Sequence, residues 1–134
     1  MPRFKITIQY DGSSFSGWQL QKNRKTVQGE IENALKVISR SKLRIPVYGS
    51  GRTDSGVHAT KQVIHFDSLV ERPNKAWVMG ANVQLPEDVS VEWASEVAEG
   101  FDARRSALSR RYLYLIQNTI VWSALMHVFI SHEL

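Results

Sequence analysis

No cysteine occurs among the 134 residues of this chain. Disulfide bonds and thiolate metal sites are therefore excluded, and the composition suits a reducing compartment. Long apolar runs are also missing, because the longest, around residues 120–130, is interrupted by Ser123 and His127 and is too short to cross a bilayer. The first residues, from Met1 to Lys5, show no charged segment followed by an apolar stretch, as an export signal would. We therefore expect a cytoplasmic protein that does not enter the membrane.

Acidic residues are scarce in one part of a chain that is basic as a whole. The formal net charge is +4 and the sequence pI is about 9.6, which favours polyanionic partners. Between Phe101 and Tyr114 a single acid, Asp102, accompanies four arginines, which are Arg104, Arg105, Arg110 and Arg111. Arginine holds phosphates and aromatic faces stack on bases, so the stretch is typical of an RNA-binding groove. A solvated strand face with extended arginines is an equally good interpretation of this stretch by itself.

Hydrophobic periodicity predicts an α+β fold. Alternating apolar residues predict strands over 4–10, 62–67 and 89–93, the last with Val89, Val91 and Trp93 on one face, and a shorter strand is predicted over 44–49. Helical spacing after a Thr26 cap predicts a helix over residues 27–38, and Pro73 marks the start of a second helix. The resulting order, β-α-β-β-α-β, is that of the ferredoxin-like antiparallel sheet, to which residues 110–117 would add a strand.

The stretch from Gly51 to Ala59, GRTDSGVHA, is the strongest candidate for chemistry. Its glycines allow the backbone to turn tightly or to approach a ligand closely. Asp54 would project from this loop, and the Arg52 guanidinium two residues away would help to keep its carboxylate ionised where water is excluded. The same residue types form ordinary turns, however, in which Asp54 would only close an Asx-turn.

Several motifs in combination decide against the turn-only interpretation of Asp54. They are Tyr10-Asp11-Gly12-Ser13 with Phe15 and Gly17-Trp18-Gln19, Thr26-Val27-Gln28-Gly29-Glu30, Gly51 to Ala59, Arg72-Pro73 through Asn82 with Leu85-Pro86, and Arg110-Arg111-Tyr112. In this order, and across nearly the whole chain, they resemble the TruA-type tRNA pseudouridine synthases. The ferredoxin-like fold then corresponds to the N-terminal half of such an enzyme.

The resemblance implies that uridine is isomerised to pseudouridine in the anticodon stem-loop of tRNA, with neither a metal nor an organic cofactor. Asp54 corresponds to the catalytic aspartate, which attacks the target nucleoside so that the glycosidic bond breaks. A carboxylate suits this task because it can form and release a covalent adduct and stabilise positive charge on the sugar. Arg52 would occupy the space of the extruded base, and Tyr112 would stack on the target uracil.

The resemblance also implies contacts with the tRNA backbone. The residues concerned are Phe101, Asp102, Ala103, Arg104 and Arg105, with Arg72 as a further phosphate contact at the start of the second helix. His58 would support the loop rather than act as a base, and we interpret His65 as structural.

Members of the family are longer than this chain and pair two ferredoxin-like halves around the cleft, usually as homodimers. We therefore assign residues 1–118 to the N-terminal half and residues 119–134 to a segment that connects toward a second half. Without that half, Asp54 would be more solvated and its electrostatic contribution weaker. The alternative function is a tRNA-binding module without catalysis. An RRM-type reader is disfavoured because no aromatic Gly-Phe signature lies on a central strand.

Overall fold

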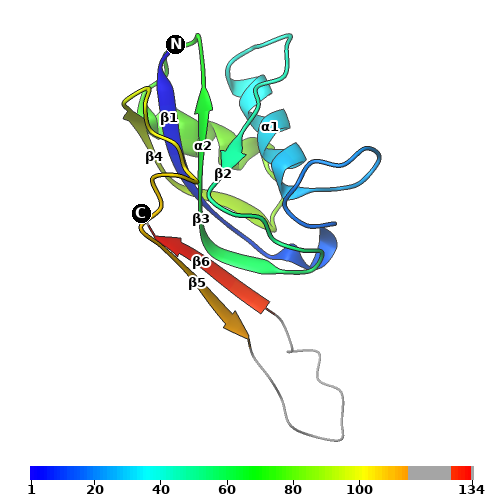
Figure 1. The fold of residues 1–134 in the computed structure, drawn as a ribbon. Coiled ribbons are helices and arrows are strands. Elements are labelled where there is room, and N and C mark those ends of the chain that lie inside the picture. The colour runs from blue at the N-terminus through cyan, green and yellow to red at the C-terminus, as the bar shows by residue number, and fades with distance from the viewer. Residues whose placement is uncertain (115–127, 134) are drawn as a thin grey trace, which may run out of the picture.

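A computed structural model describes residues 1–114 and 128–133 of the chain. In chain order its elements are β1 (Arg3–Tyr10), a single helical turn η1 (Gly12–Ser14), α1 (Val27–Ile38), β2 (Tyr48–Gly49), β3 (His58–Asp67), α2 (Asn74–Gln84), β4 (Val89–Val97), β5 (Ser109–Tyr114) and β6 (Val128–Glu133). The first four strands and two helices confirm the predicted α+β class and the β-α-β-β-α-β order (Figure 1). Neither of these helices is long and apolar enough to span a bilayer.

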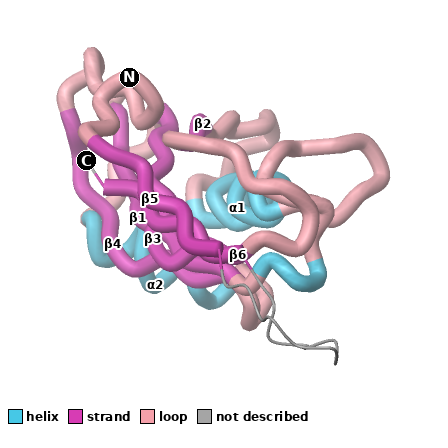
Figure 2. The backbone as a smooth tube through the Cα atoms, turned by 60° about the horizontal axis from the view of Figure 1, so that its bottom comes forward, coloured by secondary structure: helices cyan, strands magenta, loops and turns pink. Residues whose placement is uncertain are grey.

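The strands of the described residues form one sheet in the order β4-β1-β3-β6-β5, with β2 also paired to β3. β1 runs antiparallel to both β3 and β4. β2 and β6 share one edge of β3: Tyr48 of β2 pairs with His65, whereas β6 runs parallel to the earlier part of β3, from His58 to Lys61. The β5–β6 pair therefore lies beside the point where the Gly51–Ala59 loop enters β3, and Figure 2 shows it continuing the run of strands.

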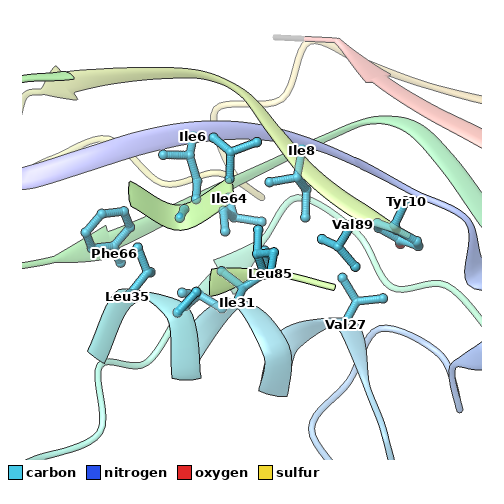
Figure 3. Close-up of a cluster of buried hydrophobic side chains, with 14 of the residues drawn as sticks. Ile6, Ile8, Tyr10, Val27, Ile31, Leu35, Ile64, Phe66, Leu85 and Val89 are labelled. Carbon is cyan, nitrogen blue, oxygen red and sulfur yellow. The ribbon is translucent and has the colours of Figure 1, made fainter. Parts of the chain in front are cut away.

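Both helices bury their apolar faces against the same side of this sheet. The Thr26 hydroxyl caps α1 by accepting a hydrogen bond from the Gly29 amide (3.2 Å), and the apolar stripe of the helix then faces the strands. Figure 3 shows Val27, Ile31 and Leu35 of α1 opposite side chains of β1 and β3. The helices thus cover one face of the sheet and leave the β3 edge to the groove described below.

The predicted face of β4 is wrong at one residue, Trp93. Val89 and Val91 are buried as expected, but Trp93 is 61% exposed and Ala94 takes the next buried position. The cause is a register shift: Ile8 of β1 pairs with Val91 while Thr7 pairs with Trp93, so one extra residue of β4 is left between them. Such a bulge reverses the side-chain alternation that follows it.

The predicted strand over residues 44–49 is reduced to the two residues of β2. The Val47 amide donates to a carboxylate oxygen of Glu32 (3.2 Å) instead of to a neighbouring strand, and Arg44 binds the same carboxylate. Pro46 between them has no amide hydrogen to offer a ladder. The buried carboxylate of Glu32 on α1 therefore binds this segment, which the alternating pattern had predicted to pair within the sheet.

The end of the chain holds a strand that periodicity does not predict. Parts of two predicted elements lie outside the described residues. They are residues 115–117 of the expected last strand, and residues 119–127 and 134 of the expected connecting segment. Within that segment, β6 pairs with β5 and β3, and so belongs to the same sheet as the first half. The boundary at residue 118 stays a prediction.

Candidate active site

The loop that carries Asp54 is attached to the segment after β1 by main-chain hydrogen bonds. The Trp18 amide donates to the Thr53 carbonyl (3.0 Å), and the Gly56 amide donates to the Phe15 carbonyl (3.3 Å). A turn over residues 54–57 is closed by the Val57 amide and the Asp54 carbonyl (3.1 Å). Because the Asp54 carboxylate forms no hydrogen bond with the described residues, it is not the group that makes this turn, and the Asx-turn interpretation is wrong.

Two glycines allow the segment after β1 to touch this loop. Gly17 has a φ of +84°, and a Cβ atom there would lie 2.7 Å from the Thr53 carbonyl oxygen. A Cβ atom on Gly12 would lie 1.8 Å from the Val57 carbonyl oxygen. Side chains at either position would push the loop away. The segment after β1, which contains Gly12 and Gly17, therefore supports the Gly51–Ala59 loop by close main-chain contact.

A buried hydrogen bond between two hydroxyl groups fixes Thr53, the residue before Asp54. Tyr10 Oη and Thr53 Oγ1 lie 2.7 Å apart. Burial raises the pKa of Tyr10 to about 12, although the hydrogen bond with Thr53 acts in the opposite direction. The phenol is therefore neutral over the physiological range and serves as a fixed hydrogen-bonding partner.

Gln62 holds the start of the loop and was missed by the sequence analysis. Its side-chain amide donates to the Gly51 carbonyl (2.6 Å), and its oxygen accepts from the Ser50 hydroxyl (3.1 Å). The side chain is fully buried on the same face of β3 as Ile64 and Phe66. An amide at a core-facing strand position was the available signal, because a buried polar group needs partners.

His58 supports the end of the loop, as the resemblance implied. The Gly12 amide donates to its Nδ1 (2.9 Å). An Asp11 carboxylate oxygen lies 3.1 Å from the same nitrogen. The buried imidazole ties η1 to the start of β3.

A groove of about 1080 Å³ opens along the β2 and β5 side of this loop. It is lined by arginines, by aromatic residues and by main-chain atoms of the strands: Trp18, Gln19, Gln28, Val47, Tyr48, Gly49, Ser50, Gly51, Arg52, Asp102, Arg104, Arg105, Arg110 and Tyr112. Asp102 is the one acid among these residues. The groove brings together residues that lie more than fifty positions apart in the sequence.

The structure divides the segment that was predicted to contact RNA. Asp102 accepts hydrogen bonds from the amides of Arg104 (3.0 Å) and Arg105 (2.9 Å), and the Arg105 bond is the main reason that its pKa is lowered. Arg104 and Arg105 are exposed, whereas the Ala103 side chain is fully buried. Phe101 packs edge-on against His65, with ring centroids 6.1 Å apart. Asp102, Ala103 and Phe101 thus build the turn that presents the arginines.

Tyr112 lines the groove from β5, and strand register sets its distance from the loop. It pairs with Ile130 of β6, which in turn pairs with Ala59 of β3, so its Cα lies two strand spacings, about 10 Å, from the end of the loop. Arg110, two residues earlier, donates from Nε to the Ser50 carbonyl (2.7 Å) and from Nη2 to the Arg104 carbonyl (2.8 Å). These bonds connect β5 to both neighbouring loops.

Asp54 lines an adjacent depression of about 430 Å³ rather than the groove itself. Arg52 and Gln19 line both hollows and so form the wall between Asp54 and Tyr112. Arg52 and Asp54 are exposed and form no ion pair with each other, so the expected support of the carboxylate by this guanidinium is not present in this conformation. Arg72 lines neither hollow, and its guanidinium donates to the Glu71 carbonyl (3.2 Å).

The fold and the site together define a ferredoxin-like α+β domain with an accessible aspartate beside an arginine-rich groove. The sequence profile of a family described as tRNA pseudouridine synthase matches residues 6–104, and the chain belongs to this family.

The chain is also similar to proteins named tRNA pseudouridine synthase A. It is 47% identical over 126 residues to that of Coxiella burnetii (strain Dugway 5J108-111), 48% over 130 residues to that of Glaesserella parasuis, and 45% over 130 residues to that of Actinobacillus pleuropneumoniae serotype 5b. These matches cover 94% to 97% of the chain but only 48% to 49% of each relative. The chain thus spans about half the length of the relatives it matches.

Proposed function

We propose that this chain is the half of a tRNA pseudouridine synthase that carries the nucleophile, and that it isomerises uridine in the anticodon stem-loop of tRNA together with a second half. In this reaction the bond from N1 of uracil to C1′ of ribose breaks, the base turns, and a bond from C5 to C1′ forms while the C5 proton is lost and N1 gains one. Asp54 attacks the nucleoside and is released when the new bond is complete. The reaction needs no metal or organic cofactor.

The observation that carries this proposal is the shared wall formed by Arg52. Arg52 lines both the hollow that contains Asp54 and the groove that contains Tyr112, so a base taken out of its stack would pass this residue on its way to the carboxylate. The Asp54 carboxylate is exposed and makes no hydrogen bond within the described part of the chain, so it is available to a nucleoside. The Tyr112 ring would stack on the uracil, and Arg104 and Arg105 would hold the phosphates.

The exposure of Asp54 also supports a need for the second half. A carboxylate in open water acts in a high dielectric, where its interaction with a developing positive charge is weak. A covering half would exclude this water and bring its own charges to the site. We propose that the complete enzyme works as a cytoplasmic homodimer, and that the chain acts on tRNA only when so covered.

A chimera tests the role of Asp54. This chain would replace the matching residues of the Coxiella burnetii relative, to which it is 47% identical over 126 residues. Pseudouridine formation in tRNA would be measured for the chimera, for Asp54→Asn and for Glu96→Gln, an exposed acid of β4 outside both hollows. We expect Asp54→Asn to reduce turnover to background with RNA affinity unchanged, because the amide keeps the shape and loses the nucleophile. Equal turnover of the Asp54→Asn and Glu96→Gln variants would refute the proposal.

The second candidate function, a tRNA-binding module without catalysis, is favoured by the same exposure of Asp54 and by the basic groove. It predicts that the 134-residue chain binds tRNA with strong salt dependence and that the chimera also lacks turnover. The intact relative serves as the positive control for the assay. Activity of the chimera would exclude this candidate.

A further inference from the structure

We propose that Tyr48 forms a second base-binding position in the groove, which takes an unpaired nucleotide of the RNA several positions away from the target uridine. The inference rests on the proposed function only in requiring that the groove binds RNA. It concerns a residue of β2 for which the sequence indicated no role.

The Tyr48 ring is held on one face and left open on the other. It stacks on the His65 imidazole with centroids 5.1 Å apart and an interplanar angle of 24°. The residue is nevertheless 53% exposed, and it lines the groove. A ring already fixed by stacking loses little conformational freedom when a base stacks on its free face. This is the geometry of a platform for a single-stranded nucleotide.

The support beneath Tyr48 is itself fixed and uncharged. His65 is buried, and burial, with a further contribution from Arg3, lowers its pKa. Its Nδ1 accepts a hydrogen bond from the Ala103 amide (3.0 Å), and Phe101 meets its edge. A neutral imidazole with one nitrogen so engaged acts as an aromatic surface.

The same imidazole connects the platform to the phosphate-binding candidates. The Ala103 amide, which donates the hydrogen bond to His65, belongs to the turn closed by Asp102. This turn presents the exposed residues Arg104 and Arg105 to the groove. A base on Tyr48 would therefore have guanidinium groups within the same groove for its phosphates. The buried His65 side chain therefore supports both the Tyr48 ring and the turn that carries the two arginines.

Strand register places this position far from Tyr112. Tyr48 pairs with His65, whereas Tyr112 is aligned through β6 with Ala59, six residues earlier on β3. A bulge in β3 after Ala59 takes up one of these residues, so at about 3.3 Å per residue the Cα atoms of the two tyrosines lie about 17 Å apart along the sheet. That span exceeds the rise between neighbouring bases of one strand, about 3.4 Å, several times over. The groove, at about 1080 Å³, is larger than most pockets for a single small ligand, which occupy about 300–1,000 Å³.

The test uses short RNA stem-loops with 2-aminopurine at one unpaired position at a time, titrated with the 134-residue chain and its variants. Stacking on Tyr48 quenches the fluorescence, and we expect quenching at a position separated from the target uridine by several nucleotides. Tyr48→Phe keeps the ring and should keep the quenching. Tyr48→Leu keeps an apolar cover over His65 but has no aromatic face, so it should lose the quenching and weaken RNA binding roughly 5- to 150-fold.

A matched control is Trp93→Leu, which removes an exposed aromatic ring from β4 outside the groove and should leave RNA binding unchanged. Thermal melting of each variant confirms that it is folded. A purely structural role for Tyr48 predicts that Tyr48→Leu binds RNA like the original chain, and that result would overturn the inference. The same holds if quenching persists in Tyr48→Leu.

The outcome can be separated from that of the proposed function. In the chimera, the inference predicts that Tyr48→Leu raises KM and leaves kcat unchanged, because Tyr48 is remote from the reacting atoms. If the chimera has no turnover while quenching depends on Tyr48, the enzymatic proposal fails and this one stands. If turnover is normal and KM is insensitive to Tyr48→Leu, only this inference fails.

Discussion

The two sides of the candidate site are held by different kinds of contact. On the Asp54 side, main-chain amides and carbonyls of the segment after β1 bind the loop, and glycines allow the two backbones to touch. On the groove side, side chains form hydrogen bonds with main-chain atoms. Arg110 donates to two carbonyls, His65 accepts a hydrogen bond from an amide, and the Asp102 carboxylate accepts the hydrogen bond that closes a turn. The first side fixes the main chain that carries Asp54, whereas the second presents guanidinium groups to solvent.

This difference corresponds to what each side would do. A nucleophile must be placed to within a fraction of an ångström, and rigid main-chain contacts provide such placement. Phosphate binding depends on charge and tolerates flexible side chains, because long-range attraction does not require a single geometry. Mutations on the two sides should therefore affect different measurements: stability and turnover on one, salt-dependent affinity on the other.

The largest effect on stability is expected where the backbones touch, and two glycines allow a matched test. Gly17 and Gly56 have nearly the same φ, +84° and +81°, but of these two only Gly17 has described atoms within 4 Å of the position that a Cβ atom would take. Gly56→Ala should lower the free energy of unfolding by about 1–2 kcal/mol, the cost of a left-handed alanine. Gly17→Ala adds an overpacking cost of about 1–3 kcal/mol. Urea unfolding of both variants measures the difference.

Gly100→Ala serves as the reference, because its φ is not left-handed and no atom of the described residues lies within 4 Å of the added methyl group. It should leave stability nearly unchanged. If Gly17→Ala and Gly56→Ala lower the free energy of unfolding equally, the contact between the segment after β1 and the loop contributes nothing to stability. The proposal that this contact holds the Asp54 loop in place is then wrong.

An intermediate effect is expected from Tyr10→Phe, which leaves the Thr53 hydroxyl without its buried partner. The expected loss of stability at neutral pH is about 1–3 kcal/mol. The pKa of Tyr10 is about 12 in the fold, above its ordinary value of 10.0, so the neutral phenol stabilises the fold fully below pH 10. That stability should be lost as pH rises from 10 toward 12. Urea unfolding between pH 7 and pH 12 should show a steeper decline for the original chain than for Tyr10→Phe.

How far the sequence could predict this molecule depended on the range of the interactions involved. The strand of residues 4–10 and the helix after Thr26 were predicted because alternation and capping are local signals. The β4 bulge was not, since the extra residue is defined only by pairing with β1 and turns Trp93 to the outside. The Glu32 carboxylate that replaces most of a strand at Val47 acts across fifteen positions of the sequence, and no local pattern records it.

The candidate site shows the same limit. Motifs singled out Asp54, Arg52 and Tyr112, and the structure brings the last two to one groove. Motifs could not show that Ala103 and Phe101 face His65, because that contact joins segments more than thirty positions apart. Nor could they predict that Arg52 and Asp54 form no ion pair, which depends on side-chain directions within the loop.

The smallest effect per residue is expected from single arginines of the groove side, and it should appear in RNA affinity rather than in stability. Arg104 and Arg105 are exposed, and their main-chain contacts do not involve the guanidinium groups, so Gln at either position should leave unfolding unchanged. If each holds one phosphate, each substitution should reduce the slope of log affinity against log salt by about 0.7–0.9.

Arg72→Gln is the comparison that sharpens this prediction, because Arg72 was also expected to bind phosphate but lines neither hollow. Binding of tRNA to the 134-residue chain would be measured over a range of salt concentrations for the three variants. We expect a reduced slope for Arg104→Gln and Arg105→Gln and an unchanged slope for Arg72→Gln. The opposite pattern would mean that RNA follows the start of α2 instead of the groove, since a released counterion reports a phosphate contact wherever on the surface it is made.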